Sequence, residues 1–171
     1  MERSQWYVGV PNGVVLCVDY VTGGSEPGGR LYHSYSREMT PFSNMDEVLF
    51  YMEKLYDYLK FPYPTTNTRS FLAEPLKKGP GEERIKIMKD EELLSQHGDL
   101  GSFIIRVQHR QNSSWQGRIT WVDENQTVSF RSVWEMIKLM AGAIDTVSDS
   151  EESFEEAEWP KREEQQNADK T

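Results

Sequence analysis

Cysteine is almost missing from this chain, because Cys17 is the only one in 171 residues. A single thiol excludes an internal disulfide, and sparse cysteine is typical of proteins that work in a reducing cytosol. The chain also has no run of about 18 apolar residues, the length that a membrane-spanning helix needs. Its polar start, Met1–Gln5, leads into no apolar run that would indicate a signal peptide. We therefore expect a cytoplasmic protein with no membrane segment.

Positive charge is also scarce. The chain has 19 Lys and Arg residues against 28 Asp and Glu residues, and its net charge is -9. Residues 145–171 hold ten acids and three bases, a net charge of -7, which leaves only -2 for residues 1–144. General nucleic-acid binding needs a basic surface that displaces counterions. The composition argues against such binding, although it leaves open a local basic patch on the body.

Sequence patterns of catalytic and metal sites are absent. His33, His97 and His109 are scattered, and Cys17 has no partner at the spacing of metal ligands. The glycines before Arg30 are not followed by a helix, so they do not form a phosphate-binding loop. No common hydrolase, metalloprotease or nucleotide-binding motif occurs. We therefore predict that the protein is not an enzyme and binds no cofactor and no metal.

The chain does contain an internal repeat. Residues 29–52 align without a gap with residues 117–140, at a constant offset of 88. Identical pairs at this offset include Gly29/Gly117, Arg30/Arg118, Phe42/Phe130 and Met52/Met140. Identity is low, but the matching positions are those that a core needs, which favours a tandem duplication.

The first copy has the pattern of strands followed by a helix. Alternating and β-branched residues predict strands at Trp6–Val10, Val14–Tyr20 and Arg30–Ser36, and a short segment that ends at Phe42. Apolar residues then recur at intervals of three and four from Met45 to Leu59, which predicts an amphipathic helix. We expect it to begin near Ser43, with Asp46 as the capping-box partner, and to end before Pro62.

The second copy repeats this pattern after a join. Strands are predicted at Ser102–Gln108, Trp115–Val122 and Thr127–Phe130. A capping box of Ser132 and Glu135 begins the helix. Its predicted apolar face consists of Val133, Met136, Ile137, Met140, Ala141 and Ile144. Within the join, the pattern predicts a strand at Glu83–Met88 and a helix at Asp90–His97 that is closed by Gly98.

These elements predict an α+β fold. One ββ(β)α unit of about 45 residues buries too little surface to be stable alone. We expect the two units to form one antiparallel sheet with both helices on one face, although two packed halves are an alternative. The expected organisation is a first copy at 1–60, a linker with a short strand and helix at 61–101, a second copy at 102–144 and a disordered acidic tail at 145–171.

One hairpin of the second copy is the main candidate for a binding surface. Trp and Arg are the side chains most enriched at binding hot spots. The hairpin supplies Arg106, Gln108, Arg110, Gln111, Asn112, Trp115, Gln116 and Arg118. The alternative is that Trp115 packs on its own hairpin and that the arginines are solvated.

Three further aromatic residues are candidate contacts. Trp134 lies off the apolar stripe of its helix, so we expect it to be exposed or half-buried; the matching position in the first copy is Asp46. Phe154 and Trp159 lie among the acids of the tail, where they would anchor a partner. The alternative for the tail is that it only improves solubility.

The second copy also resembles a known group of proteins. The run F-I-x-R-V-Q-x-R-Q-N-x-x-W-Q-G from Phe103 to Gly117, together with Phe130-Arg131-Ser132, resembles a module in small uncharacterised proteins of Firmicutes mobile elements and phages. The resemblance covers about 45 residues and brings no catalytic residues. It implies a host-interaction role in the cytoplasm of a bacterial host cell. Small acidic proteins of such elements often inhibit host defences.

Two functions follow as hypotheses. The first is a non-enzymatic, protein-binding inhibitor of a host enzyme that handles nucleic acid, most specifically an anti-CRISPR protein that binds a type II RNA-guided nuclease or its guide complex. The second is a nucleic-acid-binding accessory module, in which the hairpin arginines contact phosphate and Trp115 stacks on a base. A structural adaptor is the third alternative.

Overall fold

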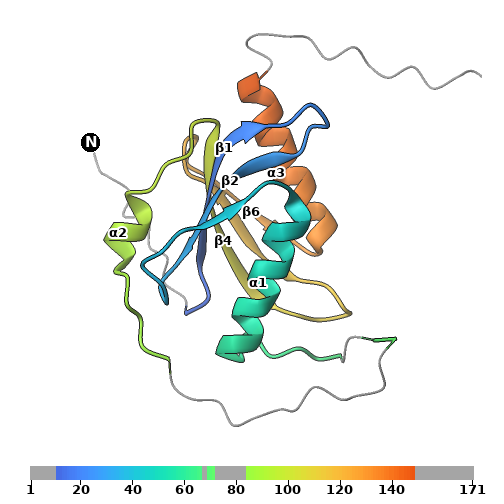
Figure 1. The fold of residues 1–171 in the computed structure, drawn as a ribbon. Coiled ribbons are helices and arrows are strands. Elements are labelled where there is room, and N and C mark those ends of the chain that lie inside the picture. Colours follow the sequence, from blue (N-terminus) through green and yellow to red (C-terminus); the bar gives the residue numbers. More distant parts are fainter. Residues whose placement is uncertain (1–10, 67–68, 72–83, 149–171) are drawn as a thin grey trace, which may run out of the picture.

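The computed structural model describes residues 11–66, 69–71 and 84–148. In this part of the chain a six-stranded antiparallel sheet carries three helices, so the predicted α+β class is confirmed (Figure 1). The strand order is β3-β2-β1-β4-β5-β6. The elements are β1 Val14–Val21, β2 Pro27–His33, β3 Thr40–Phe42, α1 Met45–Leu59, α2 Asp90–Leu94, β4 Gly101–His109, β5 Gln116–Trp121, β6 Gln126–Phe130 and α3 Val133–Ser148.

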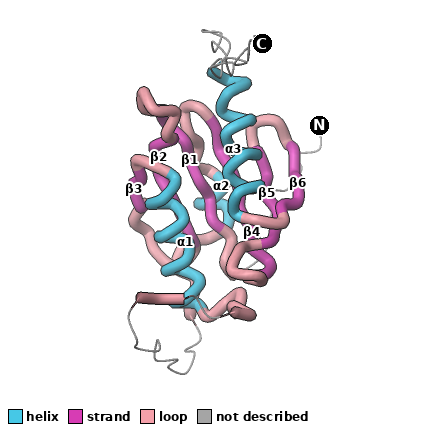
Figure 2. The backbone as a smooth tube through the Cα atoms, turned by 90° about the vertical axis from the view of Figure 1, so that its right-hand side faces the viewer, coloured by secondary structure: helices cyan, strands magenta, loops and turns pink. Residues whose placement is uncertain are grey.

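The helices divide between the two faces of the sheet. α1 and α3 share one core cluster with side chains such as Leu16, Phe103 and Ile105. α2 lies on the opposite face, where its Leu93 packs in a smaller cluster with Ile104. Figure 2 shows α1 and α3 side by side in front of the strands, with α2 behind them. Both long helices therefore cover one face, as the sequence predicts.

The same order of elements occurs in both halves of the sheet. β1-β2-β3-α1 and β4-β5-β6-α3 meet where β1 pairs with β4. The ladder between these two strands includes the pair Val15 and Ile104, and its middle pair is Leu16 and Phe103. Each half has an irregularity in its first strand, one between Val18 and Tyr20 and one between Val107 and His109.

A glycine lies opposite each irregularity. Gly29 pairs with Val18 and Gly117 pairs with Val107. A Cβ atom at Gly29 would collide with the carbonyl oxygen of Cys17, and one at Gly117 would collide with that of Arg106. The backbones approach so closely that only glycine fits, which explains why this residue matches at the 88-residue offset.

The amphipathic pattern of α1 is confirmed, but its predicted cap is wrong. Asn44, one residue after Ser43, is the N-cap, and its side chain accepts a 2.9 Å hydrogen bond from the Glu47 backbone N–H. The Glu47 carboxylate accepts in return from the Ser43 backbone N–H at 2.7 Å. The capping pair is therefore Asn44 with Glu47, because Asn caps as well as Ser and Glu reaches further than Asp46.

The cap of α3 is the predicted one, since the Ser132 hydroxyl accepts from the Glu135 backbone N–H at 3.1 Å. Ala143 rather than the predicted Ala141 belongs to the buried face. The helix also runs to Ser148, so the predicted tail boundary at residue 145 is wrong. The remainder of that tail, with Phe154 and Trp159, lies outside the described residues, as does the predicted strand Trp6–Val10.

The join differs most from prediction. Residues 84–88 form no strand, and Ile85 and Ile87 are exposed; instead, the Ile87 and Met88 backbone N–H groups both donate to the Ser34 carbonyl. α2 ends at Leu94 and not at His97, and its N-cap is Lys89. β2 begins at Pro27, three residues before the predicted start at Arg30, because Gly28 and Gly29 pair with β1.

Candidate functional site

Arg110, one of the candidates of the hairpin, is buried against α1. Its side chain is 4% exposed. Nε donates to the Pro62 carbonyl at 2.7 Å, and Nη1 lies 3.0 Å from the Glu53 carboxylate and 2.7 Å from that of Asp57. A guanidinium with these partners has its charge balanced inside the fold. Arg110 therefore holds the hairpin loop to α1 and the segment after it.

Trp115 is buried beside the same helix. Its residue is 6% exposed, and its indole N–H donates to Glu53 at 2.9 Å. The ring meets Tyr56 edge-on, with centroids 5.5 Å apart and an angle of 77° between the planes. Of the two alternatives for Trp115, the structure therefore agrees with packing against its own protein, because the side chain fills the space between the hairpin and α1.

The intervening loop is closed by its own side chains. The Gln116 amide accepts from the Gln111 backbone N–H at 3.1 Å and donates to the Gln111 carbonyl at 3.0 Å. Asn112 adopts a left-handed backbone conformation with φ 53°, which Asn tolerates better than most residues. The Ser114 hydroxyl accepts from the Val133 backbone N–H at 3.0 Å and so joins the loop to the start of α3.

The predicted hairpin surface therefore separates into two parts. The residues from Arg110 to Gln116 form a structural clamp between the hairpin and the two long helices. Arg106 and Arg118 pair across β4 and β5, and Arg118 is exposed. Burial, and then the neighbouring Arg118, lower the pKa of Arg106. Sequence reasoning missed the acids Glu53 and Asp57, whose only signal was their spacing of four residues beside the apolar stripe of α1.

The expected exposure of Trp134 is confirmed. It is 66% exposed in the first turn of α3, and Lys138 Nζ lies 5.8 Å from its ring centroid. On α1, Phe50 is 74% exposed. Phe50 lies at the position that matches Lys138 at the 88-residue offset. Phe50 on α1 and Trp134 on α3 are thus large aromatic side chains that the core does not use.

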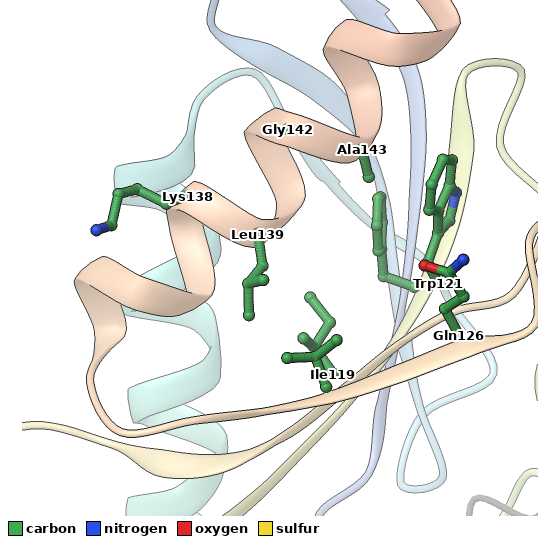
Figure 3. A pocket seen from close by; sticks show the side chains of 9 residues that line it. Ile119, Trp121, Gln126, Lys138, Leu139, Gly142 and Ala143 are labelled. Atoms are coloured by element: carbon green, nitrogen blue, oxygen red, sulfur yellow. The ribbon is translucent and has the colours of Figure 1, made fainter.

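A second surface feature lies between β6 and α3. A pocket of about 300 Å³ opens there, and its mainly apolar walls come from Phe103, Ile119, Trp121, Gln126, Val128, Lys138, Leu139, Gly142 and Ala143. Figure 3 shows Leu139 and Ala143 pointing from α3 toward Ile119 on the sheet, whereas the Lys138 chain extends away. Val128 is 45% exposed at the rim. The sequence analysis did not identify this pocket.

The described part of the chain also bears on metal sites and membrane-spanning segments. It contains no group of three or more His, Cys, Asp or Glu residues that would hold a metal ion. None of its helices has the length and apolar character needed to span a bilayer. Comparison of the chain with protein-family models, curated proteins and solved structures finds no match.

Proposed function

We propose that this protein is a non-enzymatic, protein-binding inhibitor whose partner contacts the outer face of α1 and α3. The observation that carries the proposal is the exposure of Trp134 on a regular helix. Exposed Trp is uncommon, because its ring is the largest apolar surface that a side chain offers. Trp is also among the residues that contribute most to binding energy at interfaces.

The scaffold does not need these aromatic residues. Asp46 and Phe50 on α1 match Trp134 and Lys138 on α3. On α1 the charged residue comes first and the aromatic residue follows, whereas on α3 the aromatic residue comes first and the charged residue follows. Since a shared fold accepts either kind of residue at each place, we attribute the aromatic side chains to partner contact.

We further propose that the two halves arose by duplication. The support is the register of the sheet. Val15 and Ile104, which face each other across β1 and β4, lie 89 residues apart in the chain. The irregularity in β4 also lies 89 residues after the one in β1. The pairs Gly29–Phe42 and Gly117–Phe130 correspond at the offset of 88. Such a pattern is expected when two copies of one unit share a sheet about a pseudo-twofold axis.

The identity of the target rests on the resemblance to proteins of mobile elements. On that basis we propose a type II RNA-guided nuclease of the bacterial host, or its guide complex, as the target. A protein surface with aromatic anchors suits an inhibitor that docks on the enzyme. The acidic residues 149–171 would complement the basic channel that holds nucleic acid.

A cleavage assay tests this function. Titrating the protein against several type II nucleases should suppress plasmid cleavage by at least one of them. Trp134→Ala should weaken that inhibition about tenfold or more, the effect of losing roughly 1.4 kcal/mol at a hot spot. Tyr20→Ala, which changes an exposed aromatic residue on β1, is the matched control and should inhibit normally. Undiminished cleavage by every nuclease at excess protein would contradict the target.

The acidic segment has a separate test. Deleting residues 149–171 leaves α3 intact and removes nine acids and three bases. Association with the nuclease should slow and lose much of its dependence on salt, because electrostatic steering is lost. The melting temperature should stay nearly constant. Unchanged association kinetics, measured by stopped-flow or surface plasmon resonance, would restrict this segment to solubility.

Direct nucleic-acid binding receives less support from the geometry. That hypothesis requires Trp115 to stack on a base and Arg110 to contact phosphate. Trp115 is buried, and Arg110 is already paired with two carboxylates. Arg106 and Arg118 do not bring an exposed aromatic platform with them, so we do not propose this function.

A further inference from the structure

β6 is an edge strand of the sheet that the described residues form. Among the described residues, none pairs with its outer side. Natural edge strands are usually short, charged or interrupted by proline, since an open ladder invites another strand. The opposite edge, β3, has three residues with Pro41 at its centre. β6 has five residues, Q-T-V-S-F, without charge or proline, and four of them are exposed.

The pocket lies beside this edge. Val128 faces the same side of the sheet as its partner Ile119, and both line the pocket with Leu139 of α3. A strand added to β6 would place alternate side chains over the pocket, as in complexes where a peptide extends a sheet beside a helix. The edge and the pocket therefore form one docking surface, which we call the β6 groove. Trp134 is not among its lining residues.

We propose that the β6 groove binds the β6 strand of a second copy of this chain, in antiparallel orientation with Val128 opposite Val128. The sequence of β6 is complementary to itself in this register. Thr127 of each copy faces Ser129 of the other, and hydroxyl pairs of this kind stabilise antiparallel strands. No charge faces a like charge. The contact is isologous, so it closes as a twofold dimer and does not propagate into a fibre.

The dimer would also cover the exposed apolar surface of the pocket. In the twofold arrangement both Val128 side chains lie on the face that carries α3, and each approaches the pocket of the other copy. The two sheets become one continuous sheet with six strands from each chain. This inference goes beyond the proposed inhibitor function, since it concerns the edge strand β6 and not the Trp134 ring, which Lys138 at the pocket adjoins.

Sedimentation equilibrium tests the proposal on the full chain. Between about 1 and 100 μM, the mass should rise from 19.9 kDa toward twice that value. Val128→Lys places a charge on the edge and should weaken dimerisation at least tenfold. Val21→Lys, a similarly exposed valine at the end of β1, is the matched control and should dimerise normally. Circular dichroism checks that both variants fold.

Disulfide trapping locates the contact. Cys17 is the only native cysteine, and burial raises its pKa to about 11, which keeps the thiol protonated and inert. Under mild oxidation, Val128→Cys should form a disulfide-linked dimer within minutes, whereas Val21→Cys should remain largely monomeric. A wild-type chain that is monomeric at every concentration overturns the proposal. A dimer that is neither weakened by Val128→Lys nor trapped by Val128→Cys overturns it as well.

Discussion

Replacing Phe130 with alanine is expected to lower the free energy of unfolding by about 3–5 kcal/mol. Phe130 is almost fully buried at the end of β6 and belongs to the main core cluster beneath α3. Its strand partner is Gly117, which offers no side chain to fill the space that the ring would leave. Urea denaturation followed by circular dichroism measures the change.

Phe42→Ala provides the matched comparison in the other half. Phe42 is equally buried and pairs with Gly29, so the substitution should cost a similar amount. A surface substitution, Phe50→Ala, should change stability by no more than about 0.5 kcal/mol. If either core phenylalanine could be replaced at that small cost, the two rings would not be equivalent supports of the fold. The argument for duplication would then lose its energetic basis.

The long elements of this fold with a regular apolar pattern can be predicted from the sequence. The three-and-four spacing of α1 and the β-branched run of β1 each specify one structure, and the structure has both. The predictions of local structure are wrong where contacts between distant parts of the chain determine the conformation. Residues 84–88 alternate like a strand, yet contacts with distant parts of the chain determine their position. The Ile87 and Met88 N–H groups donate to the Ser34 carbonyl, and Met88 packs in the smaller core cluster. No local pattern predicts hydrogen bonds such as these, whose donors lie 53 and 54 residues after Ser34 in the chain.

The clamp shows why Trp115 and the arginines of its hairpin have the sequence pattern of a binding surface. Trp and Arg are enriched at hot spots because a planar ring and a planar guanidinium make large, directional contacts. The same properties serve a structural junction. Whether Trp and Arg form a binding surface or a structural junction depends here on Glu53 and Asp57. These two acids lie more than 50 residues before Arg110 in the chain. Their carboxylates, which are partly exposed, supply the charged partners of the buried Arg110 that the sequence of the hairpin does not contain.

The β6 groove was missed for a different reason. Strand order decides which strand is an edge, and the sequence predicted a shared sheet without ordering its six strands. Once β3 and β6 are known to be the edges, the contrast between Pro41 in one and Thr127-Val128-Ser129 in the other is visible in the sequence alone. Edge chemistry therefore becomes informative only after topology is fixed.

Trp115→Ala is expected to destabilise the protein by about 3–5 kcal/mol, the range for truncating a buried aromatic residue. The loss combines the cavity beside Tyr56 with the hydrogen bond to Glu53. Trp115→Phe keeps most of the ring and should recover much of this loss. Trp134→Ala makes the same change at an exposed ring and should shift stability by no more than about 0.5 kcal/mol.

The pair of tryptophan variants also separates structure from binding. If the clamp is structural, Trp115→Ala should lower the urea midpoint, and at low temperature the fraction that remains folded should still bind the partner with normal affinity. Trp134→Ala should leave the midpoint in place and weaken partner binding. Unfolding curves together with calorimetric titration measure both quantities on the same samples. Normal stability of Trp115→Ala would contradict the clamp, because a ring buried between a hairpin and a helix cannot be removed without loss of packing.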